Sequence, residues 1–331
     1  MARLASMQKT IQKYGITSSN DPYPPSLHLE LIPTMIIKYY CAVVVLFVLT
    51  SCESGTATDE DTVAGKPYDY CYAVGDSVFL CSVTGEKRIP VPGTDACLSP
   101  AGTRLAYTDT TAPDGQRRIA IIRLNADTQT TVYPDTGCHN CFGPMWSPDG
   151  KQLAYSAYKD GWNIKCLNLA TGRSTTLAQA ANTGMGIYAP TWTADSRNII
   201  AQDMDAIYII GLDGQVKKSF QIRDIDTSLL ITSNSRFWLS KEQDRLIYDM
   251  ETNEDKPTGA VYVYQLATRI KCRLSPQGYD CSHPTIKGDT VFFNGSKDDP
   301  GNYETYKVDL NGQGFKKMFR GRDLSMRRND L

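Results

Sequence analysis

The segment Pro144–Leu177 constrains the fold more than any other part of the chain. It contains three short apolar runs, which the turn-forming pairs Asp149-Gly150, Asp160-Gly161 and Thr171-Gly172 separate. Short apolar runs joined by tight turns predict antiparallel strands, and a fourth, polar strand is expected at Arg173–Leu177. Four such strands form a small sheet without a helix. A sheet of this kind cannot bury both faces alone, so it requires copies of itself beside it.

The copies are found at a nearly constant spacing. Trp146, Trp192 and Trp238 lie 46 residues apart, and Leu98 and Ile286 lie 48 residues outside this series on either side. The strand that follows each marker also repeats, as Leu105–Tyr107, Leu153–Tyr155, Ile199–Ala201, Leu246–Tyr248 and Val291–Phe293. A period in the forties with four strands per unit is typical of a β-propeller blade, so the sequence predicts an all-β fold.

One repeat also resembles a known family. The run Trp146-Ser147-Pro148-Asp149-Gly150, followed by Leu153-Ala154-Tyr155 and later by Thr171-Gly172, is similar to the WD40-like repeat of TolB-like propellers. Other copies depart from it, since Thr193–Ser196 and Ser240–Gln243 keep the turn but lose the proline or the glycine. The resemblance covers residues 67–331 and implies a role in interactions within the cell envelope.

The number of blades follows from the chain ends. Five blades are readable, and residues 67–93 supply three strands of a sixth that lacks its innermost strand. Propellers usually close by pairing both chain ends in one blade, which removes a free edge. We expect Asp323-Leu324-Ser325 to provide the missing strand, with Thr62–Gly65 as the alternative. The prediction is six four-stranded blades, one of them closed by the chain ends.

The region before the propeller has the pattern of an export signal. Residues 35–51 combine Lys38, the apolar run Ala42–Leu49 and small residues, which predicts a secretory signal peptide. The run Leu49-Thr50-Ser51-Cys52 resembles the lipobox of bacterial lipoproteins. This resemblance implies that Cys52 becomes a lipidated N-terminus, anchored in the bacterial outer membrane and facing the periplasm or the cell surface. A signal anchor, or an ordinary secretory signal with an incidental cysteine, is the alternative.

These features divide the chain into four parts. We expect Met35 to be the true start, so that residues 1–34 are an extension that comes from a wrongly assigned start codon. Residues 52–66 are small and acidic, which predicts a flexible tether between the lipid and the propeller domain at 67–331.

Eight cysteines follow Cys52, and an even number in an exported protein suggests disulfides. A three-residue turn after Val74 would place Cys71 opposite Cys81, and Cys272 and Cys281 flank a Ser-Pro-Gln-Gly turn. Cys138 and Cys141 lie in the loop before the strand at Phe142. This last pair could be a redox pair or half a metal site. It lacks a thioredoxin-like helix start and further ligands, so we interpret it as a disulfide.

Few residues suggest catalysis or cofactor binding. The net charge of −1 gives no argument for nucleic acid, and Gly184–Ala189 matches a dinucleotide fingerprint but leads into a strand, so we expect no nucleotide. No G-x-S-x-G nucleophile motif is present. Asp298, Asp299, Asn302 and Glu304 could hold calcium, but a polar loop is the simpler interpretation. We predict no cofactor and no metal.

The candidate binding face comprises loops that enter the innermost strands. These loops should converge at one mouth of the central channel, where His139, Tyr188, Arg236 and His283 are expected to be exposed. We interpret the three repeated tryptophans as packing between blades and not as a sugar-stacking platform. The predicted function is a non-catalytic lipoprotein that binds a protein, peptide or glycan. The alternative is a glycan-active lyase or hydrolase, with acid pairs such as Asp203/Asp205 or Asp224/Asp226.

Overall fold

The structure is a computed structural model, and it describes residues 67–75, 77–124, 131–135, 137–138, 140–178, 186–227, 231–252, 258–297 and 302–327. The chain divides into two units, Met1–Ser54 and Gly55–Leu331, and every described residue belongs to the second. The predicted extension at 1–34, the signal peptide at 35–51 and the tether at 52–66 therefore lie outside the described residues. No helix in the described ranges is long and apolar enough to cross a membrane.

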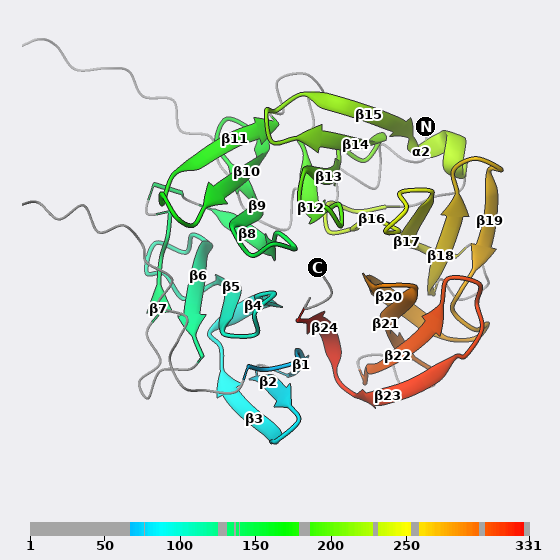
Figure 1. The fold of residues 1–331 in the computed structure, drawn as a ribbon, viewed down its shortest axis with the longest axis horizontal. Coiled ribbons are helices and arrows are strands. Elements are labelled where there is room, and N and C mark those ends of the chain that lie inside the picture. The colour runs from blue at the N-terminus through cyan, green and yellow to red at the C-terminus, as the bar shows by residue number, and fades with distance from the viewer. Residues whose placement is uncertain are drawn as a thin grey trace, which may run out of the picture. The chain divides into compact units, whose positions relative to one another are not determined.

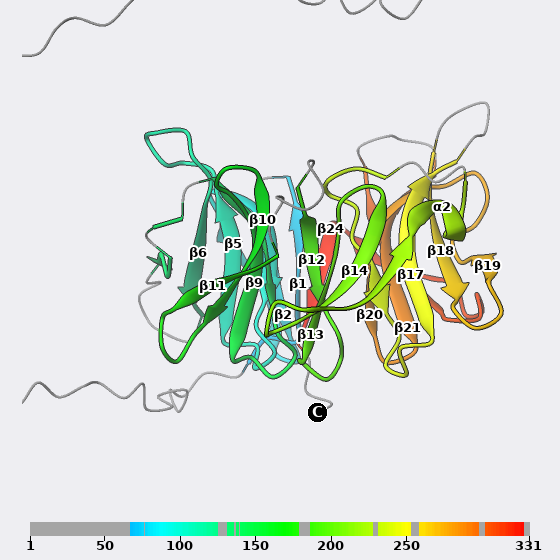
Figure 2. The same ribbon diagram turned by 90° about the horizontal axis from the view of Figure 1, so that it is seen from above.

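The second unit is a β-propeller of six four-stranded antiparallel sheets, as predicted. Figure 1 shows the six sheets arranged radially around one axis, with one strand of each sheet nearest the centre. In Figure 2 the innermost strands run roughly along that axis. We number the blades 1 to 6 in chain order. Their innermost strands are β24, β4, β8, β12, β16 and β20.

Each blade has four strands, ordered from the inside outward. Blade 1 has β24 (Arg322–Met326), β1 (Tyr70–Val74), β2 (Ser77–Ser82) and β3 (Gly85–Pro90). Blade 2 has β4 (Gly93–Leu98), β5 (Arg104–Asp109), β6 (Arg118–Arg123) and β7 (Thr131–Val132). Blade 3 has β8 (Cys141–Trp146), β9 (Gln152–Tyr158), β10 (Trp162–Asn168) and β11 (Ser174–Ala178).

Blade 4 has β12 (Tyr188–Trp192), β13 (Asn198–Gln202), β14 (Ala206–Gly211) and β15 (Val216–Gln221). Blade 5 has β16 (Trp238–Leu239), β17 (Arg245–Glu251), β18 (Gly259–Gln265) and β19 (Ile270–Arg273). Blade 6 has β20 (Asp280–Lys287), β21 (Thr290–Ser296), β22 (Glu304–Asp309) and β23 (Lys316–Arg320). The short helix α2 (Ile222–Ile225) follows β15.

The chain ends close blade 1 in the predicted way. The C-terminal strand β24 pairs with β1, so that Cys71 faces Ser325, and the innermost strand is therefore the predicted Asp323-Leu324-Ser325 segment. Ser325 also joins blade 1 to blade 2, because its hydroxyl accepts a hydrogen bond from the Leu98 backbone N–H at 2.9 Å. Closure thus gives β1 a partner on its inner edge.

The repeated tryptophans pack between blades. Trp146, Trp192 and Trp238 have exposed fractions of 4%, 2% and 3%. The indole Nε1–H of Trp146 donates to the Cys97 carbonyl, and that of Trp192 donates to the Met145 carbonyl, each at 2.9 Å. Each of these two rings therefore satisfies its polar atom on the inner strand of the preceding blade. The predicted packing role is confirmed, and it leaves these rings no face for stacking with a ligand.

The innermost strands share a second feature, which the sequence did not reveal. Five of the six contain a register shift of the β-bulge type against the second strand of the same blade. At each bulge one residue takes a left-handed backbone conformation, with φ between 52° and 66°. These residues are Asp95, Gly143, Ala189, His283 and Asp323. A bulge bends the strand and leaves backbone groups without their normal ladder partners.

Side chains of the neighbouring blade supply the missing partners. The backbone N–H of Gly143 donates to the Thr108 hydroxyl at 3.0 Å, and that of Ala189 donates to the Ser156 hydroxyl at 3.3 Å. Two further bonds have the same pattern, since His283 N–H donates to Asp249 at 3.1 Å and Asp323 N–H donates to Asn294 at 2.9 Å. Each acceptor lies at the equivalent position of a second strand. We call this repeated contact the inter-blade latch.

The latch predicts a clear effect of a nearly isosteric substitution. Thr108→Val keeps the volume of the fully buried side chain but leaves the Gly143 N–H without an acceptor and removes the hydrogen bond from the Thr108 hydroxyl to Asp95. We expect the free energy of unfolding to fall by about 1–3 kcal/mol, the cost of an unsatisfied buried donor. Urea denaturation followed by circular dichroism measures it. The control Thr176→Val changes an exposed residue of β11 and should cost less than about 0.5 kcal/mol. Equal losses in both variants would contradict the latch.

Candidate functional site

The innermost strands of all six blades surround a cavity of about 440 Å³ on the propeller axis. The five left-handed bulge residues all line it, so the bulges, four of which the latch holds, also shape this cavity. Each innermost strand lies at the end of its sheet, and its second edge is therefore not paired within that sheet. The wall of the cavity therefore consists of backbone edges and of residues from all six blades.

The cavity wall carries more positive than negative charge, although the chain as a whole is nearly neutral. Four basic side chains line it, and they are Arg117, Arg236, Lys287 and Arg322. The carboxylates that line it are Asp95 and Asp323, and the exposed imidazole of His283 also lines it. This excess of basic groups favours a ligand with negative charge.

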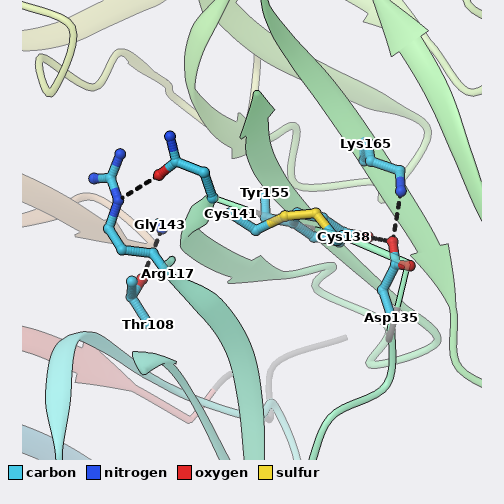
Figure 3. The surroundings of a disulfide bond; sticks show 9 residues. Thr108, Arg117, Asp135, Cys138, Cys141, Gly143, Tyr155 and Lys165 are labelled. Carbon is cyan, nitrogen blue, oxygen red and sulfur yellow. Dashed lines mark hydrogen bonds and ion pairs between the residues drawn. A yellow bond between two sulfur atoms is a disulfide. The ribbon is translucent and has the colours of Figure 1, made fainter. Parts of the chain in front are cut away.

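Arg117 is held at the mouth by an aromatic group. Its guanidinium carbon lies 4.5 Å from the ring centroid of Phe142 and 5.5 Å from that of Trp162. Its Nε–H donates to the Asn140 side-chain oxygen at 2.9 Å, the contact drawn in Figure 3. Burial lowers the pKa of Arg117, which the charge of Asp95 partly opposes. Arg117 was not predicted from the sequence, because the predicted face was built only from loops that enter innermost strands, whereas Arg117 precedes β6.

The predicted face residues have different outcomes. Arg236 and His283 line the cavity, where Arg236 is half-buried and His283 is exposed. Tyr188 does not present an exposed side chain, since it is only 7% exposed and its ring packs against Trp162, with 6.2 Å between centroids. The next residue, Ala189, has the left-handed backbone conformation of the bulge. His139 lies outside the described residues.

Asp249 does not line the cavity itself but holds a residue that does. Its carboxylate accepts the latch hydrogen bond from His283 N–H. Loss of hydration raises the pKa of Asp249, and this outweighs the opposing effects of His283, its backbone hydrogen bond and the positive charge of Arg236. Asp249 is not among the residues that line the cavity.

The Cys138–Cys141 disulfide is present in the structure, with 6.3 Å between the Cα atoms. Figure 3 shows it next to a half-buried ionic group, in which Lys165 and Tyr155 both donate to Asp135 at 2.6 and 2.5 Å. Burial opposes the charge on Asp135, but the hydrogen bonds from Lys165, Tyr155 and Ser174 together hold its pKa below the usual value. The disulfide and this group fix the segment that leads into β8 and thereby position Phe142.

The other two predicted disulfides are wrong. Val74 pairs with Ser77, so the turn between β1 and β2 has two residues instead of three. Cys71 consequently faces Leu80 and Cys81 faces Tyr70, which directs the two thiols to opposite faces of the sheet. Cys272 is exposed on the outermost strand of blade 5, whereas Cys281 is buried on the innermost strand of blade 6. All four are free thiols.

One carboxylate of each acid pair proposed for catalysis has a structural partner. Asp203 accepts hydrogen bonds from the backbone of Asp205 and Ala206 and from the Tyr208 hydroxyl. Asp226 pairs with Lys271, outside the cavity. Among the described residues no group of three or more His, Cys, Asp or Glu side chains could hold a metal ion. Asp298 and Asp299 of the calcium alternative lie outside those residues, as do Gly184 and Met185 of the fingerprint.

Solved structures share this fold at low sequence identity. TolB from Acinetobacter baumannii matches with a TM-score of 0.55 and 16% identity, over 80% of this chain and 67% of that one. The chain has the six-bladed propeller fold of TolB. This fold confirms the predicted resemblance to TolB-like propellers.

Two further solved structures are similar to this chain. A nidogen/laminin complex has a TM-score of 0.53 and 13% identity, over 78% of this chain and 96% of that one. A puromycin-hydrolyzing peptidase from Mycobacterium tuberculosis has a TM-score of 0.48 and 17% identity, over 79% of this chain and 46% of that one. No protein-family model matches this chain. No curated protein sequence matches it either.

The pKa of Asp249 predicts how stability depends on pH. A carboxyl whose pKa is higher in the folded state binds its proton more tightly there, so stability falls as pH rises from the unfolded value of about 3.9 through the raised folded value. Asp249→Asn cannot ionise but still offers an oxygen to His283 N–H. We therefore expect its free energy of unfolding, relative to the wild type, to increase between about pH 4 and pH 7.

Urea denaturation at the two pH values measures this difference. Asp160→Asn, at an exposed turn, is the matched control and should change stability little at either pH. A difference between Asp249→Asn and the wild type that stays constant or decreases with pH would show that Asp249 does not titrate in this way.

Proposed function

We propose that this chain is a non-catalytic lipoprotein of the cell envelope, whose propeller binds a protein, peptide or glycan partner at the channel mouth. The cavity lined by all six innermost strands carries this proposal, because its wall offers basic side chains and unpaired strand edges at one place. The TolB fold supports an envelope role, and the nidogen/laminin complex provides an example of a propeller of this kind in a protein complex.

A glycan-active lyase or hydrolase is the second candidate. Asp249 is the group that favours it, since a raised carboxyl pKa is what a general acid requires. Against this, its carboxylate already accepts the His283 backbone N–H and does not line the cavity. In the two predicted acid pairs, Asp203 accepts the hydrogen bonds of a turn and Asp226 forms an ion pair. We therefore favour binding over catalysis.

A ligand screen distinguishes the two. The full chain is mixed with envelope peptides and glycans, and its melting temperature is followed, since a ligand that binds only the folded state raises it. We expect one ligand class to raise the melting temperature and Arg236→Ala to abolish that rise without changing the temperature of the free protein. Release of a product from any glycan would instead support the enzyme.

The lipid anchor has a separate test. Cells that express the chain are labelled with a fatty acid, and we expect the label to appear in the wild type and to be lost in Cys52→Ser. Cys41→Ser changes a cysteine inside the expected signal peptide and should retain the label. Label in Cys52→Ser, or its absence from the wild type, would contradict lipidation at Cys52.

A further inference from the structure

We propose that Arg117 and Arg236 together bind a carboxylate group of a peptide at the mouth of the cavity. This inference rests on the proposed binding function and specifies the chemistry of the ligand. The ligand carboxylate is either an acidic side chain or a free C-terminus, since both present the same two oxygen atoms.

The two guanidinium groups approach the same point of blade 3 from different blades. Arg117, just before β6 of blade 2, covers the ring of Phe142, with 4.5 Å between the guanidinium carbon and the ring centroid. Arg236, just before β16 in blade 5, lies next to the following residue, because a methyl group on Gly143 would be 3.3 Å from its terminal nitrogen. A glycine at this bulge therefore leaves space into which Arg236 extends. The convergence joins residues 119 positions apart in the chain.

The charges of the two arginines are not neutralised by direct contacts. Within the described ranges neither forms an ion pair with a carboxylate, and Arg117 donates only to the neutral amide of Asn140. The cavity carboxylates have other partners. Asp95 accepts from Thr108 and Thr94, and Asp323 contacts Arg322 and Asn294. Asp249 acts on Arg236 only through its charge.

Two half-buried guanidinium groups in this arrangement favour a planar anion. Arginine presents its N–H groups as a fork that matches the two oxygens of a carboxylate, and hydrogen bonds between charged partners are stronger than neutral ones. The stacking of Arg117 on Phe142, together with its bond to Asn140, fixes the guanidinium before any ligand arrives. A ligand carboxylate would therefore complete a site whose geometry is largely preformed.

A peptide fits the surroundings better than a sugar. Sugars are commonly recognised by a flat aromatic face, but Trp146, Trp192 and Trp238 are buried between blades and the Phe142 face is covered by Arg117. The ring of Trp162 packs edge-on against Phe142, with 87° between the ring planes. It also packs edge-on against Tyr158, with 68° between the ring planes. The unpaired edges of the innermost strands instead offer backbone N–H and C=O groups, which an extended peptide can use.

Three synthetic peptides test the inference on the full chain. They are acetyl-Gly-Glu-Glu-Gly-amide, acetyl-Gly-Gln-Gln-Gly with a free C-terminus, and acetyl-Gly-Gln-Gln-Gly-amide. The first carries side-chain carboxylates, the second a terminal carboxylate and the third none. Binding is followed by titration calorimetry and by the NMR signals of the arginine Nε–H groups. We expect a carboxylate peptide to bind at least about tenfold more tightly than the neutral one and to shift the signals of both arginines.

Variants separate this site from general charge effects. Arg117→Gln and Arg236→Gln should each weaken binding of the acidic peptide about tenfold or more, and the Lys substitutions should recover only part of it, because lysine lacks the planar fork. Arg123→Gln removes the same charge from the exposed end of β6, which does not line the cavity, and should bind like the wild type. Unchanged melting temperatures confirm that the variants are folded.

Three outcomes would overturn the carboxylate site. They are equal affinity for the neutral and acidic peptides, wild-type affinity in Arg236→Gln, or no response of either arginine to the two carboxylate peptides at millimolar concentration. The general binding function is judged separately. A neutral peptide or a glycan that stabilises the chain in the ligand screen would uphold that function while this site is rejected.

Discussion

The innermost strands around the propeller axis depend on one repeated contact. It is the hydrogen bond between a side chain of the second strand of one blade and the bulged backbone of the innermost strand of the next blade. Thr108, Ser156, Asp249 and Asn294 occupy one repeat position, and each accepts an N–H from a residue that has left the regular strand conformation. A left-handed residue inside a strand is costly for any side chain larger than glycine. The latch offsets this cost by satisfying the donor that the bulge exposes, so that the strained residues can persist at the centre of the ring.

The latched bulges also determine which residues line the cavity. Each bulge breaks the alternation of its innermost strand, and the left-handed residue at the bulge lines the cavity in all five blades. His283 and Asp323 therefore reach the cavity together with Gly143, although they belong to three different sheets. The absence of a side chain at Gly143 leaves space for Arg236, which precedes the innermost strand of blade 5. The positions that stabilise the ring and those that contact a ligand are thus neighbours in the same strands.

Two junctions depart from the pattern, and both have a visible substitute. In blade 1 the residue equivalent to Thr108 is Ala73, which has no acceptor; there Ser325 bonds to Leu98 N–H and joins the closing strand to blade 2. In blade 4 the equivalent residue is Gln202, whose amide donates to the carbonyls of Thr232 and Ser235. This reversed hydrogen bond accompanies β16, an innermost strand of only two residues. The segment before β16 is therefore held by a side chain, and it carries Arg236.

Local sequence patterns were sufficient to predict the repeat, the number of blades and the strand that closes the ring, because these depend on periodic apolar runs and turn residues. They also indicated the Cys138–Cys141 disulfide, whose partners are three residues apart. The remaining features arise from contacts that form only in the folded chain. A turn shorter by one residue separated Cys71 from Cys81, and packing against Trp162 buried Tyr188. The approach of Arg117 and Arg236 to Gly143 depends on ring closure, which brings together distant residues that no local pattern connects.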